Sequence, residues 1–366
     1  MNDGIMPTHA CIPGVFDSTS EHEMTDTTIP SAIRMIDLLS GSFVAQAIYV
    51  AAKLGLADHV AAGTVSPEAL ARELGVDVTA LSRLMRLLVA HGVFRRDETG
   101  EYENTPLSTT LLSSGEDSLR DLAMWWCEEP HWRVYGHLLD SIRDGRCAWP
   151  MVHGTGLFPY LMEDNPALGE LFNRAMTSFS RTTIPAVLAA YDFSRSGVVA
   201  DLGGGNGHLL AAVLAANTEA RGILFDLPPA VAGAPDLLED AGVAGRSRIV
   251  TGDFFEPLPF TADTFLIKHI LHDWPDDECV RMLRRVREAT SEHGRVLVLE
   301  MVIPESDGPH FSKVCDIEML VSAGGRERDM AEFGRLLSAA GLKVARVIPT
   351  ASVVSIIEAV PEQACE

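Results

Sequence analysis

Two stretches in the second half of the sequence combine residue types that are suited to chemistry. The first, residues 201–207, reads Asp-Leu-Gly-Gly-Gly-Asn-Gly and follows the apolar run of residues 197–200. Its glycines let the backbone turn tightly and approach a ligand without a Cβ in the way. The helix expected to begin near His208 offers free N–H groups to a carboxylate or phosphate. This pattern predicts a strand, a glycine turn and a helix that hold a cofactor.

The spacing of the glycines distinguishes between cofactors. A dinucleotide fingerprint has glycine at its first, third and sixth positions, and counting from Gly203 the sixth position is His208, so the NAD pattern fails. Asp226 ends the next predicted strand, where a carboxylate can accept both hydroxyls of a ribose, a signal that fits NAD and S-adenosylmethionine equally. Asp253 and Phe254 follow a third strand and offer a carboxylate for an exocyclic amine and a ring for adenine, although a solvated turn is the alternative.

The second chemical stretch, residues 268–274, reads Lys-His-Ile-Leu-His-Asp-Trp at the end of a predicted core strand. Burying such a run of polar side chains costs free energy unless they are hydrogen-bonded, ion-paired or part of a functional site. His269 is interpreted as packing or backbone-linked rather than catalytic. A metal on His269, His272 and Asp273 is disfavoured, because no further ligand signature accompanies them.

Alternating strands and helices from residue 185 onward must position these groups. Strands are predicted over residues 197–201, 222–226, 248–253, 264–269, 295–300, 342–348 and 353–359, and helices over 276–289 and 330–340. The alternation predicts an α/β fold with a parallel sheet covered on both faces. Ligands then bind at the carboxyl ends of the strands.

Upstream of this α/β domain, residues 185–366, three further segments are expected. Residues 1–30 lack periodicity and predict a mobile tail, residues 31–118 a helical unit, and residues 119–184 a helical region rich in aromatic residues. Four of the five tryptophans lie in this aromatic region. Core packing explains most of them, and a pocket for a flat aromatic ligand is the alternative for some. The candidates for lining such a pocket are Trp125, His131, Met176, Phe179 and Met319.

The helical unit has the outline of a winged helix-turn-helix. An apolar helix is predicted from residue 31 to 54, a second follows the cap Ser66-Pro67 and stops at Gly75, and a third starts at Asp77 or Thr79 and closes at Gly92. A small hairpin over residues 93–103 follows. DNA binding is disfavoured, because residues 66–112 hold five basic and seven acidic side chains. We interpret the unit as a packing and dimerisation module.

Composition and charge narrow the function further. The 366 residues are 47% hydrophobic, and a net charge of −22 disfavours nucleic acid and anionic membranes as partners. The six cysteines lack metal or disulfide spacing, which indicates reduced thiols. No secretory leader is evident, and the longest apolar window, residues 43–52, is about ten residues, short of a membrane span. A cytoplasmic protein is expected.

Five motifs, taken in their order along the chain, resemble those of the small-molecule O-methyltransferases of the caffeate and acetylserotonin type, including their bacterial antibiotic-tailoring branch. The motifs are the 201–207 loop, Asp226-Leu227-Pro228, Gly252-Asp253-Phe254, Leu271-His272-Asp273-Trp274 and Gly325-Arg326-Glu327-Arg328. The resemblance covers roughly residues 31 to 360 and implies a Rossmann-like class I methyltransferase sheet with an N-terminal all-α winged-helix dimerisation domain. Arg326 where plant members often have lysine and Asp329 where threonine is usual depart from the family pattern.

The resemblance also implies roles for individual residues. His272 would be the general base, flanked by the acids Glu300 and Glu327. A phenol with a pKa near 10 is ionised only about once in a thousand at neutral pH, so a nearby imidazole that takes its proton makes it a better nucleophile, and His272 suits that task. S-adenosylmethionine would be held, with no metal, by Asp201, Gly203, Gly205, Asp226, Leu227, Asp253, Phe254, Lys268 and Trp274. Asp273 joins the expected substrate contacts.

The expected activity is S-adenosylmethionine-dependent methylation of a hydroxyl on an aromatic small molecule, in secondary-metabolite biosynthesis, by a homodimer. One alternative keeps the cofactor but transfers the methyl group to nitrogen or carbon, or uses it for an atypical decarboxylation or hydroxylation. An alternative from another class is a winged-helix transcriptional regulator.

Overall fold

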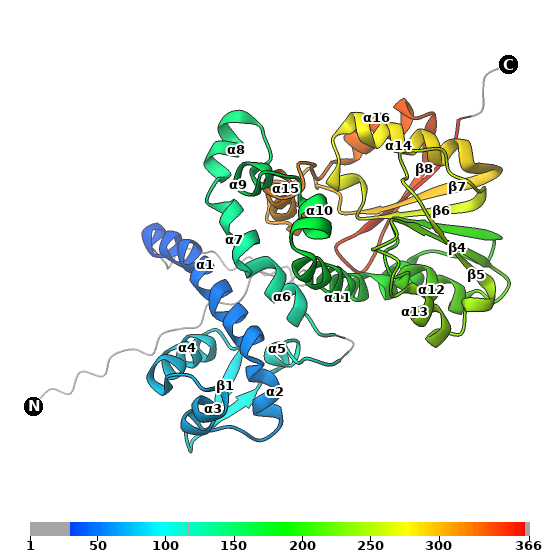
Figure 1. Cartoon of the computed structure of the whole chain (residues 1–366). Coiled ribbons are helices and arrows are strands. Elements are labelled where there is room, and N and C mark those ends of the chain that lie inside the picture. The colour runs from blue at the N-terminus through cyan, green and yellow to red at the C-terminus, as the bar shows by residue number, and fades with distance from the viewer. Residues whose placement is uncertain (1–29, 116, 363–366) are drawn as a thin grey trace, which may run out of the picture. The chain divides into compact units, whose positions relative to one another are not determined.

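The computed structural model describes residues 30–115 and 117–362. The tail predicted for residues 1–30 therefore lies outside the described residues, except at Pro30. The chain divides between Phe43 and Val44 into two units, and each is described by itself. Figure 1 labels the helices and strands.

Helix α1, Ser31–Leu54, has the bounds predicted from its apolar periodicity and is followed by Gly55 with a left-handed φ of 65°. Among the described helices it is the one long and apolar enough, by length and composition, to cross a membrane, a test that core helices and signal sequences also pass. The apolar stretch is therefore longer than the window of about ten residues predicted from the sequence. Apolar residues continue upstream of Phe43 with few charges between them.

The winged-helix outline is confirmed. Its elements are α2 Leu56–Ala61, α3 Pro67–Leu74, α4 Val78–Ala90, β1 Phe94–Arg96, β2 Tyr102–Asn104 and α5 Pro106–Thr109. Ser66 caps α3 by accepting a hydrogen bond from Ala69 N, and Asp77, rather than Thr79, caps α4 by accepting from Ala80 N. β1 and β2 pair antiparallel as the predicted hairpin.

The aromatic region forms a second helical layer around its own core. Its elements are α6 Arg120–Cys127, α7 Glu129–Tyr135, α8 Leu138–Asp144, α9 Ala148–His153, α10 Leu157–Pro159, η1 Tyr160–Asp164 and α11 Pro166–Ala190. Trp125 and Trp149 stack there with ring centroids 6.2 Å apart. Helix α11 contacts both α6 and α12 (His208–Ala216), so it connects this layer to the α/β domain.

A seven-stranded sheet in the order β5-β4-β3-β6-β7-β9-β8 forms the core of the C-terminal half. Its strands are β3 Val198–Leu202, β4 Arg221–Asp226, β5 Ser247–Thr251, β6 Ala262–Lys268, β7 Thr290–Glu300, β8 Leu342–Pro349 and β9 Ser355–Pro361. β3 to β7 pair parallel, but β9 pairs antiparallel with both β7 and β8. The expected all-parallel sheet is wrong at these last two strands, because residues 350–354 are too few for a crossover and form a hairpin connection.

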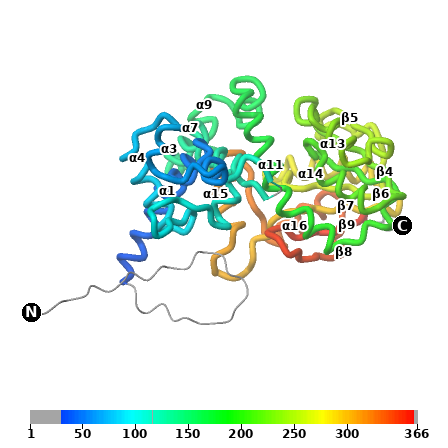
Figure 2. The backbone as a smooth tube through the Cα atoms, turned by 90° about the horizontal axis from the view of Figure 1, so that it is seen from below, coloured from blue at the N-terminus to red at the C-terminus, as the bar shows by residue number. Residues whose placement is uncertain are grey.

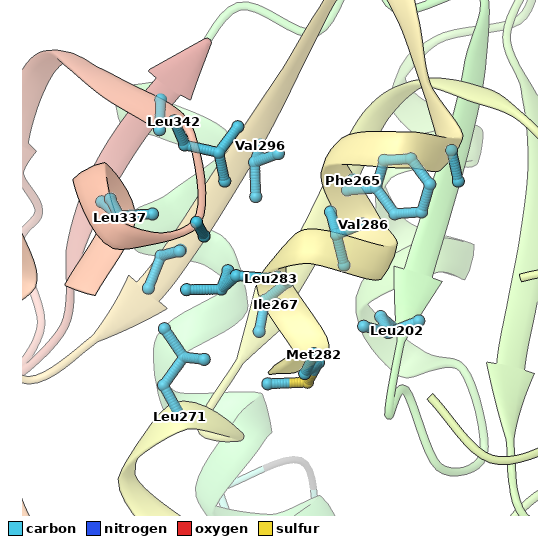
Figure 3. Packing of buried hydrophobic residues seen from close by; sticks show 14 of the residues in the cluster. Leu202, Phe265, Ile267, Leu271, Met282, Leu283, Val286, Val296, Leu337 and Leu342 are labelled. Atoms are coloured by element: carbon cyan, nitrogen blue, oxygen red, sulfur yellow. The ribbon is translucent and has the colours of Figure 1, made fainter. Parts of the chain in front are cut away.

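Helices cover both faces of the sheet. The covering helices are α12, α13 Ala234–Asp240, α14 Asp276–Ala289 and α16 Met330–Ala339. This half of the chain also contains α15 Phe311–Val321 and the short turns η2 Ala244–Arg246 and η3 Leu271–Asp273. Figure 1 shows α14 and α16 on one face and α12 and α13 on the other. Figure 3 shows Leu283, Val286 and Leu337 packing on Phe265 and Val296 of the sheet. In Figures 1 and 2, α15 lies instead among the helices of the aromatic region, where it contacts α8 and α9.

Candidate active site

The glycine loop between β3 and α12 adopts a conformation that only glycine takes easily. Gly203, Gly205 and Gly207 have φ values of 69°, 55° and 86°. A Cβ on Gly203 would lie 2.4 Å from Ile270 Cδ1, so the loop packs directly against the turn after β6. A Cβ on Gly205 would meet nothing within 4 Å, which leaves the backbone there open to a ligand.

Two carboxylates flank this loop. Asp226 Oδ2 accepts a hydrogen bond from Gly205 N at 2.8 Å, and its Oδ1 accepts one from Leu227 N at 2.7 Å. Burial raises the pKa of Asp226. Asp201 at the end of β3 is buried, its Oδ2 has no hydrogen-bond partner among the described residues, and burial raises its pKa to about 7. The loop therefore lies beside polar groups that a ligand can still engage.

The other residues predicted to contact the cofactor lie at the same sheet edge. The exposed Asp253 accepts a hydrogen bond from Phe255 N at 2.9 Å, and the Phe254 ring lies 6.1 Å from the Trp274 ring, edge on. Leu227 is 39% exposed. These positions place a carboxylate and two aromatic rings near the glycine loop.

Lys268, the last residue of β6, is tied to helix α11. Its Nζ donates a hydrogen bond to Ser180 Oγ at 2.7 Å. Burial lowers the pKa of Lys268, while Asp201 and Glu300 oppose that effect. Ser180 was missed in the sequence, because a serine in a long helix carries no signal of its partner 88 residues away.

His272, in the turn η3, is held by two acids from distant segments. Its Nδ1 donates a hydrogen bond to Glu327 Oε1 at 2.8 Å and lies 3.8 Å from Glu300 Oε2, while Nε2 lies 3.7 Å from Asp273 Oδ1. Glu300 and Glu327 are fully buried side chains. The predicted trio of His272, Glu300 and Glu327 is therefore brought together.

Glu300 also shapes the turn that carries His272. Its Oε1 accepts hydrogen bonds from Ile270 N at 3.0 Å and Leu271 N at 2.9 Å. Burial alone would raise the pKa of Glu300, but the neighbouring imidazoles and these N–H groups lower it overall. Glu300 therefore remains an anion that orients the backbone of η3.

The three carboxylates set the charge of the imidazole. Burial by itself lowers the pKa of His272, but Glu300, Asp273 and Glu327 outweigh burial and raise it to about 10. Burial raises the pKa of Asp273 to about 7, although His272 opposes it. At neutral pH His272 is thus an imidazolium within a cluster of acids.

Arg328 was missed as a site residue, although it stands next to Glu327. Its side chain is fully buried, and its Nη1 and Nη2 donate to Leu271 O and Trp274 O, each at 2.8 Å. Nε and Nη2 also donate to Asp276 Oδ1 at 3.0 and 2.8 Å. Arg328 O accepts from Ile303 N at 3.0 Å, just beyond β7. One residue thus links the turn of His272, the segment of Glu327 and the end of β7.

Neither of the two departures from the family pattern makes a described hydrogen bond to the Glu327 carboxylate. Arg326 Nη2 lies 3.1 Å from both Asp276 Oδ2 and Glu332 Oε1. Asp329 caps α16 in a reciprocal pair of hydrogen bonds with Glu332.

The predicted substrate residues separate into three groups. Phe179 lies beside the site, 5.5 Å from the His269 ring, and Asp273 adjoins His272. Met176 and Met319 are half-buried. Trp125 and His131 are almost fully buried in the aromatic core, which supports the packing alternative for both.

His131 already has a hydrogen-bond partner at each ring nitrogen. Nδ1 bonds to Trp126 O and Nε2 bonds to Glu318 Oε1, each at 2.8 Å. Tyr135 donates to the other oxygen of Glu318. This buried network connects α7 to α15, and no sequence pattern predicts it because Glu318 is 187 residues away from His131.

A metal-like grouping is present at the same edge. One ligand atom each from His269, His272 and Glu300 lie within 4.8 Å of one another. The carboxylate oxygen that lies near both imidazoles is Glu300 Oε2, which has no hydrogen-bond partner among the described residues, whereas His272 Nδ1 donates to Glu327.

Two family models match this chain. Residues 135–343 match the model of an O-methyltransferase domain, and residues 36–114 match that of an O-methyltransferase dimerisation domain. A phenazine O-methyltransferase of Lysobacter antibioticus is 39% identical over 91% of this chain and 97% of its own length. Its crystal structure superposes with a TM-score of 0.86 and covers 91% of this chain and 100% of that one.

Other relatives differ in what they methylate. A mitomycin biosynthesis 6-O-methyltransferase of Streptomyces lavendulae is 39% identical over 91% of this chain and 95% of its own. An 8-amino-8-demethylriboflavin N,N-dimethyltransferase of Streptomyces davaonensis is 32% identical over 86% and 91%. The structure of the neocarzinostatin O-methyltransferase NcsB1, with S-adenosylmethionine and 2-hydroxy-5-methyl naphthoic acid, is 36% identical with a TM-score of 0.74, covering 87% and 95%.

Proposed function

The chain belongs to the O-methyltransferase family, whose members join a catalytic domain to a dimerisation domain, and from that premise we propose that His272 takes the proton of an aromatic hydroxyl whose oxygen is methylated. The observation that carries the proposal is the hydrogen bond from His272 Nδ1 to Glu327 Oε1. It keeps Nδ1 protonated in the neutral imidazole that remains once the imidazolium has released a proton to solvent, so Nε2 is the nitrogen that accepts the proton of the acceptor hydroxyl.

The residues at the sheet edge fit S-adenosylmethionine, the cofactor of this enzyme family. The open backbone at Gly205 leaves room for it, Asp226 is placed for its ribose, and the Phe254 ring for its adenine. The unpartnered oxygen of Asp201 adds a buried acidic group suited to a cation. When bound, the cofactor supplies an electrophilic methyl group on a sulfonium.

The charge of His272 determines how the proton moves. A phenol with a pKa near 10 and an imidazolium whose pKa is about 10 hold their protons almost equally well. Loss of one proton from this pair gives either phenol beside imidazole or phenolate beside imidazolium. The phenolate is the nucleophile, and the acids around His272 keep the proton nearby while it reacts.

Alignment of the reacting atoms is expected to contribute more than the base. Positioning supplies roughly 7–11 kcal/mol of a barrier, against about 10²–10⁴-fold for a general base. The buried hydrogen bonds of Glu300 and Arg328 to the turn η3 serve that alignment.

The acceptor is an aromatic small molecule, as for the phenazine and mitomycin enzymes named above, and the setting is secondary-metabolite biosynthesis in the cytoplasm. The protein acts as a homodimer. Its dimerisation domain and the exposed apolar side chains of α1, among them Ile36, Leu39 and Phe43, support this. Light scattering of the purified protein tests the dimer.

Methyl transfer to nitrogen is the second candidate, because the riboflavin relative is an N,N-dimethyltransferase. A neutral aromatic amine needs no base before attack, so the acids gathered around His272 favour oxygen.

A screen with labelled S-adenosylmethionine separates the two. Phenols and hydroxyquinones are assayed beside anilines of the same skeleton, and mass spectrometry locates the methyl group. Product on oxygen supports the proposal, whereas product on nitrogen alone, or no binding of S-adenosylhomocysteine by calorimetry, refutes it.

Replacing Asp226 with alanine is expected to weaken S-adenosylhomocysteine binding about 10- to 100-fold, because a hydrogen-bonding charged group is lost. The backbone N–H of Gly205 also loses its partner. Calorimetry measures the change, and turnover at saturating cofactor changes much less. Asp236→Asn, at an exposed position, is the control. Unchanged affinity would rule out the ribose contact.

Replacing Glu327 with glutamine is expected to move the pH profile toward acid. The Glu327 carboxylate raises the pKa of His272, so its removal lowers that pKa, while the amide oxygen still accepts from Nδ1. kcat/KM for one phenol, measured between about pH 6 and pH 10, should rise at lower pH than in the wild type. Glu98→Gln, an exposed change, should leave the curve in place. A profile that does not move in the Glu327 variant contradicts the coupling.

A further inference from the structure

His269, the residue after β6, has an unusual backbone. Its φ is 53°, and within residues 30–115 and 117–362 it is the only residue other than glycine with a positive φ. Its N–H donates to Leu299 O at 3.2 Å, which fixes this conformation at the edge of the sheet. A side chain in the left-handed region costs about 1–2 kcal/mol, and glycine would avoid it. Because a histidine occupies this position despite that cost, we expect its imidazole ring to have a function.

The ring of His269 is held between two neighbours. It stacks on His272 with centroids 5.2 Å apart and an interplanar angle of 28°, and the Phe179 ring lies 5.5 Å away. The side chain is 10% exposed. His269 is therefore a fixed neighbour of the proposed base.

Both ring nitrogens of His269 are buried without a hydrogen-bond partner among the described residues. The nearest carboxylate oxygen, Glu300 Oε2, lies 3.6 Å from Nδ1, beyond hydrogen-bond distance. Each unsatisfied buried polar group costs about 1–3 kcal/mol. A hydrogen-bonding group on a bound ligand would remove that free-energy cost.

His269 differs from His272 in charge. Burial, together with Lys268 and His272, lowers the pKa of His269 to about 4 against the opposing effect of Glu300. At neutral pH the ring is uncharged and offers one N–H donor and one acceptor nitrogen.

We propose that His269 determines specificity by binding a second, uncharged polar group of the acceptor, on the carbon ortho or peri to the hydroxyl that His272 deprotonates. This inference rests on the proposed function and narrows the substrate class to catechols, ortho-hydroxyketones and their peri analogues. With hydrogen bonds of about 2.8 Å on each side, adjacent substituents on one aromatic ring can reach two imidazoles whose centroids are 5.2 Å apart.

The carboxylate of Glu300 determines which charge the acceptor's second polar group can carry. Glu300 Oε2 lies 3.6 Å from His269 Nδ1, so a carboxylate on the acceptor would meet a like charge there. A hydroxyl or ketone oxygen meets no such penalty. Acceptors with a neutral neighbouring oxygen are therefore preferred over ortho-hydroxybenzoates.

The test compares phenol with catechol, which differ only in the second oxygen. In the wild type, kcat/KM for catechol should exceed that for phenol by about 10- to 100-fold, because the analogue lacking the oxygen leaves the His269 nitrogens unpaired. His269→Phe keeps a ring without nitrogens and should remove the preference by lowering the catechol value alone. His269→Asn keeps a donor and an acceptor, tolerates the left-handed backbone and should retain part of the preference.

Folding of each variant is checked by thermal unfolding and by binding of S-adenosylhomocysteine. His269→Gly, which suits the positive φ and also lacks the nitrogens, takes the place of the phenylalanine variant if that one does not fold. Equal kcat/KM for the two acceptors in the wild type would mean that water satisfies the nitrogens, and would overturn the inference. An equal loss for both acceptors in the nitrogen-free variant would assign His269 to packing alone. A wild-type enzyme that methylates anilines but neither phenol nor catechol would instead refute the proposed function.

Discussion

His272→Ala is expected to lower kcat for a simple phenol by about two to four orders of magnitude. The variant loses the group that holds the acceptor's proton, together with the hydrogen bond to Glu327. Affinity for S-adenosylhomocysteine should stay nearly unchanged, because the glycine loop and Asp226 do not contact His272 through any described hydrogen bond. Stopped assays of methylated product and calorimetry measure the two quantities on one preparation.

A second acceptor separates proton transfer from positioning. A nitrophenol that is already ionised at the assay pH needs no base, so the alanine variant should lose much less activity with it than with phenol. His91→Ala, an exposed histidine in the winged-helix unit, is the control. A large loss of cofactor affinity, or an equal loss with both acceptors, would contradict the role of His272 as base.

Arg328→Met is expected to lower the free energy of unfolding by about 3–5 kcal/mol, the range for breaking a buried ion pair. The change removes the guanidinium hydrogen bonds to Leu271 O and Trp274 O, two carbonyls that flank His272, and leaves them the weaker donor Cys279 Sγ. The ion-pair partner Asp276 is 55% exposed, so much of the cost comes from the weakened carbonyl hydrogen bonds and the lost packing. Denaturant unfolding measures the change.

The same substitution tests whether Arg328 positions the base. Arg328→Lys retains the charge but cannot reach both carbonyls and the aspartate as a planar fork, so a folded lysine variant should lose kcat while keeping affinity for S-adenosylhomocysteine. Arg326→Met provides a matched control, since Arg326 pairs with the same aspartate at 3.1 Å but is 44% exposed. Its effect on stability should stay within about 0.5 kcal/mol. Comparable losses in the two methionine variants would show that the buried carbonyl contacts contribute little.

Local sequence patterns predicted much of the fold because their causes are local. Ser66 and Asp77 cap helices through N–H groups three residues away, and Gly75 ends a helix by adopting a left-handed φ. The glycine loop was predicted for the same reason, since tight turns with positive φ depend on the residues that form them. The direction of β9 was not predictable from periodicity, which is the same for parallel and antiparallel strands.

The residues of the site were only partly predictable. His272, Glu300 and Glu327 were found by resemblance, and the tertiary structure brings them together. Arg328 and Glu318 were missed because their partners are distant in sequence. His131 was predicted to line a pocket, but its two hydrogen bonds in the aromatic core support packing instead.

By itself the sequence determined the α/β alternation, the winged-helix outline and the glycine loop with positive φ, and its motifs predicted His272 as the base through their resemblance to a known family. Those features depend on residue type and short spacing, which are written in the chain. Only the tertiary structure decided the pairing of β9 with β7, the pKa of His272 and the unpartnered nitrogens of His269. These depend on burial and on charges contributed by segments 28 to 55 residues apart, and such distances are set by packing rather than by any local pattern.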